Sequence, residues 1–173
     1  GECMTYSVGF RAPSLAELGR DVLQRLSEHC DEALPPRLYG DPQQAAVTRP
    51  AEMPAQLQAF AQQAVQRMLD QPHALNQALG EVLTEPKAQV WFEPRPVPKR
   101  IRAWVLDASS RMLYDDGHIY LNGESWRASG ADARLMRALA DHRLLDASQW
   151  QSASPAAQAL LSEWGEHGWC HPM

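Results

Sequence analysis

The sequence predicts a mixed α+β protein that is mainly helical, with a helical first half followed by a winged-helix-like second half. Two observations predict this class. Apolar residues recur at helical spacing in three segments between residues 14 and 85, whereas short strand-like runs and turns follow residue 99. A proline-rich tract at residues 93–98 separates the two patterns and is typical of an extended, semi-rigid spacer. With 45% hydrophobic and 21% charged residues, the composition favours a folded chain over a disordered one.

The first stretch of the chain has the alternation of a β-strand. Over residues 2–8, one face carries Cys3, Thr5 and Ser7, and the other carries Met4, Tyr6 and Val8. Both faces are largely uncharged, so the strand is expected to be covered on both sides, but no second strand follows nearby. Since the chain also does not begin with Met, we expect it to be a piece of a longer protein.

Three amphipathic helices are predicted between residues 14 and 85. Ser14 and Glu17 form a capping box that opens the first helix, which runs to about His29. The second begins near Met53-Pro54, and the third begins at Pro72. The first helix carries Leu15, Leu18, Val22, Leu23 and Leu26 at helical spacing, and the second has one apolar stripe of Leu57, Phe60, Ala61, Ala64, Val65 and Met68. In the third helix, the predicted buried side consists of Leu75, Leu79, Val82 and Leu83. Three short helices make a thin core, so we predict a homodimer through residues 14–85.

The second half is predicted to be a small α+β domain. A three-stranded meander spans residues 111–127, and Asn122-Gly123 is a strong signal for a two-residue hairpin turn. Helices are expected at residues 131–142 and 154–164, with a closing strand at 168–171. The predicted division is therefore a strand within 1–13, a helical region at 14–92, the linker at 93–98 and a winged-helix-like domain at 99–173. The six tryptophans are interpreted mainly as packing residues.

No catalytic or metal-binding residue is assigned from local motifs. His29-Cys30-Asp31 matches the HxD pattern of a facial iron site, but it lies at the end of an amphipathic helix rather than on a rigid strand. His167, Cys170 and His171 crowd the C-terminus without a second cysteine. A small metalloprotein that uses either group stays open as an alternative.

A winged helix also raises a nucleic-acid-binding alternative, and the charges argue against it. The net charge is −5, and basic and acidic residues nearly balance beyond residue 99. The candidate recognition helix carries Arg134 and Arg137, which Asp132 and Asp141 offset. No run of apolar residues is long enough for a membrane span, and three scattered cysteines favour a reducing cytoplasm.

Several segments carry a resemblance to a known family. They are residues 3–13 (Cys-Met-Thr-Tyr-Ser-Val-Gly-Phe-Arg-Ala-Pro), Tyr39-x-Asp41-Pro42, Gln71-Pro72-His73, Gly80-Glu81, residues 120–124 and Gly168-Trp169. Together they make the chain similar to the C-terminal part of bacterial JmjC/cupin-type ribosomal oxygenases. These are iron- and 2-oxoglutarate-dependent dioxygenases that hydroxylate an arginine of a large-subunit ribosomal protein.

The resemblance implies a three-part enzyme with a catalytic cupin, a helical dimerisation region and a winged helix. Residues 1–13 would then hold the last strand of the cupin, with Thr5 and Ser7 as positions that face the co-substrate pocket. The Fe(II) ligands and the main 2-oxoglutarate-binding residues would lie upstream. The resemblance therefore implies that this chain alone holds no cofactor and is not an enzyme, whereas the parent protein binds Fe(II), 2-oxoglutarate and a ribosomal protein.

Overall fold

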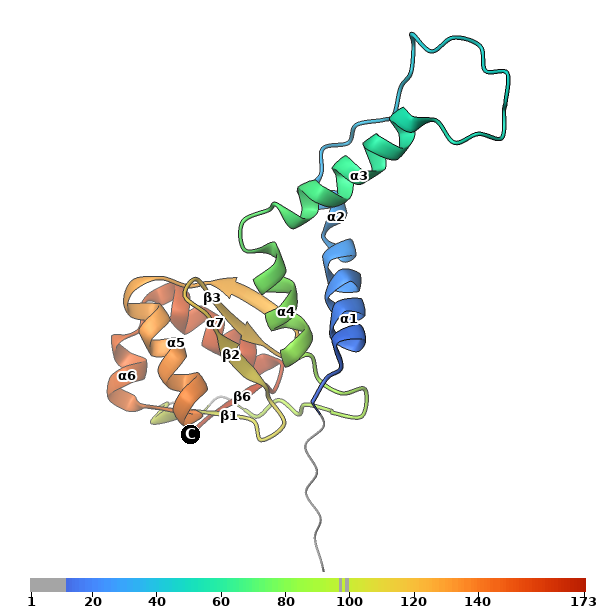
Figure 1. Ribbon diagram of the computed structural model, residues 1–173. Coiled ribbons are helices and arrows are strands. Elements are labelled where there is room, and N and C mark those ends of the chain that lie inside the picture. Colours follow the sequence, from blue (N-terminus) through green and yellow to red (C-terminus); the bar gives the residue numbers. More distant parts are fainter. Residues whose placement is uncertain (1–11, 97, 99) are drawn as a thin grey trace, which may run out of the picture.

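The computed structural model describes residues 12–173 except residues 97 and 99 (Figure 1). The predicted strand at residues 2–8, with the candidate residues Thr5 and Ser7, lies outside the described residues. The described chain is a mixed α+β structure in two parts, as the sequence predicts. A compact α+β unit occupies the second half, and the helices of the first half lie beside it and extend away from it.

The first half contains the three predicted helices and one additional short turn of helix. They are α1 (Leu15–Glu28), α2 (Cys30–Ala33), α3 (Ala55–Leu69) and α4 (Ala74–Thr84). The capping box is confirmed: the Glu17 amide donates to Ser14 Oγ, and the Ser14 amide donates to Glu17 Oε2, both at 3.1 Å. Val22, Leu26 and Ala78 form a small buried cluster between α1 and α4.

Helix α3 projects from the body of the molecule, together with the irregular segment that precedes it (Figure 1). Met68 is the buried residue of this helix. The edge of Tyr39 packs against Phe60 with ring centroids 5.7 Å apart, so the extended segment before the loop lies along α3. Leu57 and Val65, which belong to the predicted apolar stripe, are 38% and 59% exposed. These two side chains are exposed because few of the described residues outside α3 cover this helix.

The second half contains two three-stranded antiparallel sheets. The predicted meander is confirmed as β2 (Met112–Tyr114), β3 (His118–Leu121) and β4 (Glu124–Arg127), in the order β2-β3-β4. Asn122 and Gly123, with φ angles of 51° and 92°, make its turn. The other sheet, in the order β5-β1-β6, pairs β1 (Ala103–Leu106) with β5 (Leu144–Asp146) and β6 (Cys170–Pro172). Of these three strands, only the closing one was predicted.

Three helices complete this unit: α5 (Gly130–His142), α6 (Ala147–Ser152) and α7 (Pro155–Glu166). Its core is larger than that of the first half and is centred on the fully buried Trp104 and Trp164. The packing interpretation of the tryptophans therefore holds for these two. It is wrong for Trp91, which is 84% exposed because it precedes the first strand, on the segment outside the core.

The segment between α4 and β1 is held against the winged helix. Phe92 packs edge-on against Trp169 with ring centroids 6.5 Å apart. Gly168 has a φ of +74°, and a Cβ atom at this position would lie 2.7 Å from the carbonyl carbon of Glu93. The backbone at Glu93 is therefore seated on the turn at Gly168, which requires glycine both for its φ angle and for space.

Candidate functional site

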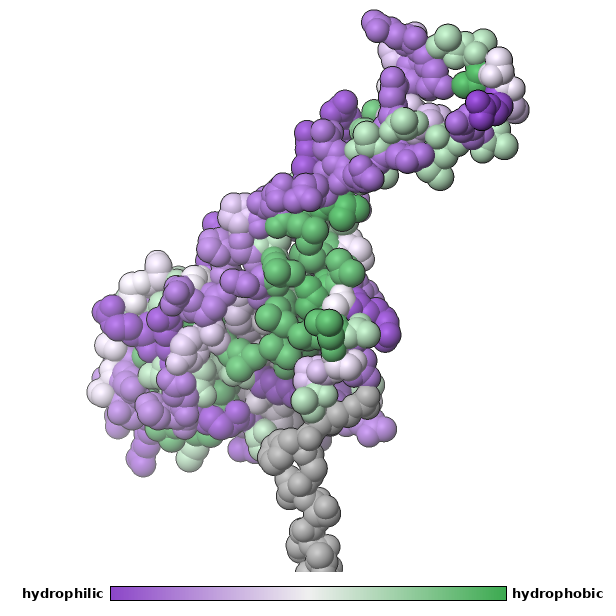
Figure 2. All heavy atoms as spheres, viewed as in Figure 1, coloured by the Kyte–Doolittle hydropathy of each residue, from purple (hydrophilic) through white to green (hydrophobic). Residues whose placement is uncertain are grey.

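The candidate site is an apolar surface on α1 and α4, which we call the leucine face. On α4 it consists of Leu75, Leu79 and Leu83, four residues apart and hence on one side of the helix. Leu75 and Leu83 are 52% and 43% exposed, and Leu15 and Leu23 of α1 are 92% and 59% exposed. Figure 2 shows a continuous hydrophobic area over α4 and α1. Contiguous apolar patches of this kind mark interaction surfaces.

This arrangement corrects the predicted buried side of α4. Leu75 and Leu83 were expected on the buried side of this helix, but small and polar residues take the buried positions instead. A Cβ atom on Gly80 would lie 2.5 Å from the Tyr120 ring, so only glycine allows the helix to approach the sheet this closely. The close approach turns the sheet-facing side of α4 inward and leaves Leu75 and Leu83 exposed, while Leu79 is partly buried against the cluster of Val22, Leu26 and Ala78.

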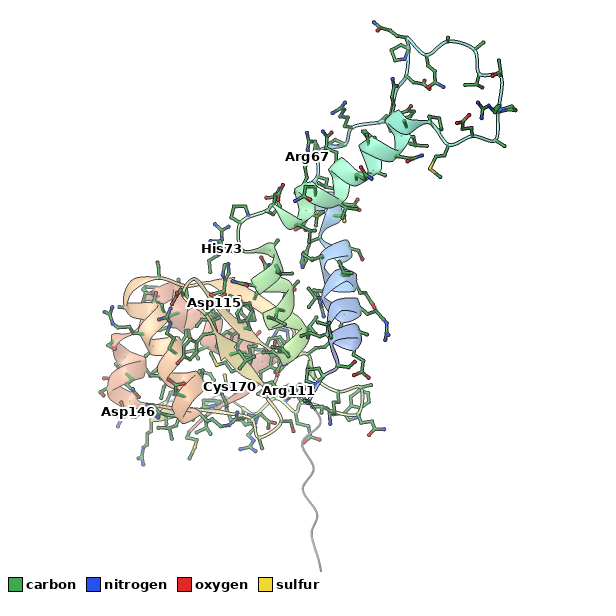
Figure 3. All side chains as sticks on the ribbon, viewed as in Figure 1. Arg67, His73, Arg111, Asp115, Asp146 and Cys170 are labelled. Carbon is green, nitrogen blue, oxygen red and sulfur yellow. The ribbon has the colours of Figure 1, made fainter. Side chains whose placement is uncertain are left out.

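Thr84 and the C-cap residue Glu85 also bond to the meander and the residue before it. Thr84 Oγ1 donates to the Gly80 carbonyl at 2.8 Å and accepts from the Gly123 amide at 3.1 Å. Arg111, labelled in Figure 3 near the C-terminal end of α4, donates from Nη1 to the Glu85 carbonyl at 3.2 Å. These bonds satisfy a terminal carbonyl of the helix and join its last turn to the β3–β4 hairpin.

Behind the leucine face, the buried carboxylate of Glu81 joins three elements. Its side chain is 5% exposed. Ser125 Oγ of β4 donates to Oε1 at 2.6 Å, and Gln77 Nε2 donates to the same oxygen at 3.2 Å. From α1, His29 Nε2 lies 3.2 Å from Oε2, and Arg25 Nε lies 3.9 Å from it. Buried charges need such partners, so Glu81 ties α1, α4 and β4 together.

The HxD residues do not converge on a common point in the structure. His29 is directed at Glu81, Asp31 is exposed, and the thiol of Cys30 contacts the carbonyl of Leu26 at 3.8 Å. Within the described part of the chain, no group of three His, Cys, Asp or Glu side chains is arranged to hold a metal ion. The role that the structure assigns to His29 is contact with Glu81, which sequence spacing could not indicate.

The C-terminal His and Cys residues are also held apart. His171 Nε2 lies 2.9 Å from Asp107 Oδ2, and His167 stacks on Trp169 with centroids 5.0 Å apart. Burial opposes ionisation of Asp107, but hydrogen bonds from His171 and the Ser109 amide outweigh it and lower the pKa of this carboxyl. Burial raises the pKa of the Cys170 thiol to about 12, which keeps it protonated and a poor metal ligand.

The arginines of α5 differ in their contacts. Arg137 Nη2 donates to the carbonyls of Asp115 and Asp116, both at 2.9 Å, and its guanidinium lies over the Tyr114 ring at 5.4 Å. Arg134 is exposed. Arg137 therefore stabilises the turn between β2 and β3, which leaves it poorly placed to bind phosphate.

Sequence reasoning assigned Asp115 only to a turn, whereas the structure makes it the centre of a polar cluster. Its Oδ1 accepts the Gly117 and His118 amides at 2.8 Å, and Oδ2 accepts the Tyr120 hydroxyl at 2.6 Å. Burial opposes ionisation, but the bonds from Tyr120, Gly117 and His118 lower the pKa of Asp115. Asp115 and Tyr120 are five residues apart on either side of a tight turn, and no short sequence pattern predicts a hydrogen bond between them.

These features define a winged-helix unit with a helical extension that carries an exposed apolar face. The chain belongs to the ROXA-like winged helix family, whose model matches residues 67–171. The match begins within α3 and so includes α4. A search of curated proteins gives no match.

Solved structures of the ribosomal oxygenase YcfD from Escherichia coli have the same fold. One, in complex with cobalt and 2-oxoglutarate, is 22% identical with a TM-score of 0.71, and the match covers 94% of this chain and 47% of that one. Another gives a TM-score of 0.70 at 22% identity, covering 95% of this chain and 48% of that one. The chain thus spans about half the length of these relatives. None of the described helices is long and apolar enough to cross a membrane.

Proposed function

We propose that this chain is the dimerisation and accessory winged-helix portion of an Fe(II)- and 2-oxoglutarate-dependent ribosomal-protein hydroxylase. The family match and the fold shared with half of a ribosomal oxygenase support this assignment. The reaction proposed for the parent protein is hydroxylation of an arginine in a large-subunit ribosomal protein, in the cytoplasm. The proposed parts are residues 1–13 in the cupin, 14–92 for dimerisation and 99–173 as the winged helix, joined by the linker at 93–98.

The leucine face is the observation that carries the proposal for a homodimer. Burying one leucine side chain contributes about 1.5–3 kcal/mol, so mutual burial of Leu15, Leu23, Leu75 and Leu83 from two copies would supply a substantial driving force. A C2 dimer fits such a surface because the same patch serves both partners. Gly19 lies between Leu15 and Leu23 in sequence, and a Cβ atom there would meet nothing within 4 Å, which leaves room for a second chain.

The described residues do not fit an iron or 2-oxoglutarate site, because His29 and Asp31 do not converge and His29 is paired with Glu81. We propose that the parent protein holds both groups upstream, with Thr5 and Ser7 facing the pocket, and we expect no 2-oxoglutarate turnover by this chain alone.

Contacts within the winged helix argue against the nucleic-acid-binding alternative. Arg137 is bonded to two backbone carbonyls, and the flanking Asp132 and Asp141 lower the positive charge along α5. Phosphate contacts dominate the affinity for nucleic acids, and this helix offers few of them. The winged helix is therefore proposed as a protein-contact or scaffold module.

Sedimentation velocity and native mass spectrometry of the chain test the dimer. We expect a dimer for the native sequence and a monomer for the double variant Leu75→Asp/Leu83→Asp, because each new carboxylate would have to be buried in the interface. Leu113→Asp is the matched control, since Leu113 is 42% exposed but lies on β2, outside the leucine face. A monomeric native chain at high micromolar concentration, or equal disruption by Leu113→Asp, would overturn the proposal.

A further inference from the structure

Helix α4 packs against the sheet with one side and contributes to the leucine face with another. Gly80, Glu81 and Thr84 are buried on the side that faces the sheet, and Leu75, Leu79 and Leu83 belong to the leucine face. The helix has 11 residues, and isolated helices shorter than about 12–15 residues are marginal in water. Its orientation must therefore come from packing, and the position of the leucine face depends on what holds the other side.

Polar contacts attach the sheet-facing side of α4 at each of its turns. Gln77 Nε2 donates to Ser125 Oγ at 3.0 Å, Ser125 Oγ donates to Glu81 Oε1 at 2.6 Å, and the Gly123 amide donates to Thr84 Oγ1 at 3.1 Å. The partners run along β4 and the turn before it. Directional bonds at three levels of one helix restrict both its rotation about its axis and its sliding along the strand.

The same network reaches α1, which carries the rest of the leucine face. Arg25 bonds from Nη2 to Glu85 Oε2 at 2.8 Å, and Arg25 and His29 both face the buried Glu81 carboxylate. A buried carboxylate is strongly disfavoured when a partner is removed, so its bonds are costly to rearrange. Glu81 thus couples the orientation of α1 and α4 to the position of β4.

From this geometry we propose that the winged helix is a rigid support, here called the mount, that fixes the orientation of the helices of the dimer interface. Ser125 and Glu81 are its positioning residues: they align α4 and α1 so that the leucine face is complementary to a second copy. Such a support needs no free basic side chain for nucleic acid, and Arg137 is bonded to the Asp115 carbonyl within the winged helix. The inference rests on the proposed dimer, but the attachment of α4 can be measured without it.

The test compares Ser125→Ala with Ser162→Ala in the whole chain. Both serines are partly buried in the winged helix, but Ser162 Oγ donates to the Gln158 carbonyl within α7 and not to the helical region. Sedimentation equilibrium would measure the dimer dissociation constant, and near-ultraviolet circular dichroism of the buried Trp104 and Trp164 would report on the winged-helix core. We expect Ser125→Ala to weaken the dimer at least fivefold with an unchanged spectrum, Ser162→Ala to leave both unchanged, and Ser125→Thr to retain the native affinity.

Hydrogen exchange separates the failure of this inference from the failure of the proposed function. A monomeric native chain would overturn the proposed dimer. The rate of hydrogen exchange of the α4 amides would then show whether the winged helix still fixes this helix. Faster exchange over residues 74–84 in Ser125→Ala but not in Ser162→Ala supports the mount. Equal protection of α4 in the two variants overturns it, as does an equal dissociation constant in the two variants of a dimeric protein.

Discussion

The hydrogen-bonded pair of Asp115 and Tyr120 at the β2–β3 turn makes the free energy of unfolding of the winged helix depend on pH. The pKa of Asp115 is lowered, because the hydrogen bonds to its carboxylate outweigh the effect of burial. Burial, together with the bond to Asp115, raises the pKa of the Tyr120 phenol well above its usual value near 10. Both shifts favour the same state, in which an ionised Asp115 accepts a hydrogen bond from the neutral Tyr120 hydroxyl.

The sign for Asp115 follows from linkage. An unfolded Asp has a pKa of about 3.9, so the stabilisation is complete above that pH and is lost as the pH falls through the lower folded value. We expect Asp115→Asn to lower the urea midpoint clearly at pH 7 and by a smaller amount at pH 3, where part of the stabilisation is lost. Urea titrations at the two pH values measure this difference. A loss of equal size at both would show that the ionised form contributes nothing.

Residue-scale predictions from sequence succeeded where the signal was local. Ser14 with Glu17, and Asn122 with Gly123, are short patterns whose hydrogen bonds or φ angles are determined within four residues. Glu81 gave no such signal, because its partner Ser125 is 44 residues away. The importance of a buried carboxylate depends on tertiary contacts that periodicity does not contain.

The packing of α4 on the meander makes opposite predictions for two helical glycines. A Cβ atom at Gly80 would meet the buried Tyr120 ring at 2.5 Å, so we expect Gly80→Ala to cost about 1–3 kcal/mol through overpacking. Gly19 on α1 has open space, and alanine should add up to about 1 kcal/mol from helix propensity alone. Chemical denaturation of both variants below the dissociation constant of the dimer gives the comparison. A neutral Gly80→Ala would mean that the helix and sheet are not in close contact.

At the scale of elements, sequence patterns located the longer helices and the meander but missed α2, β1, β5 and α6. Strands of three or four residues have too little alternation to stand out, and β1 is defined by distant partners, as Trp104 pairs with both Leu145 and Pro172. The stripes on α1 and α4 were recognised as apolar, but a stripe does not reveal what covers it. That is why the leucines of α4 were expected on a buried side, whereas the structure places Leu75 and Leu83 on the surface.

The two parts of the molecule differ in the size of their hydrophobic cores. The winged helix has a core around Trp104 and Trp164, whereas the helical region has the small cluster of Val22, Leu26 and Ala78. The helical region therefore depends on contacts outside its own core: the bonds of α4 to the sheet and, in the proposed dimer, the leucine face of a second copy. The bonds of α4 to the sheet are intramolecular, so their contribution does not depend on protein concentration. The contribution of the dimer interface does depend on it.

Thermal unfolding at different protein concentrations separates these contributions. Because association stabilises only the folded state, the unfolding midpoint of a dimer rises with protein concentration. Under the proposed function, we expect the native chain to show this rise over a hundredfold range, while Leu75→Asp/Leu83→Asp has a lower midpoint that does not change. Leu113→Asp should keep the concentration dependence, since it leaves the leucine face intact. Differential scanning fluorimetry and circular dichroism together cover the range. A native midpoint that is constant with concentration would mean that the thin helical region is stabilised by the winged helix alone.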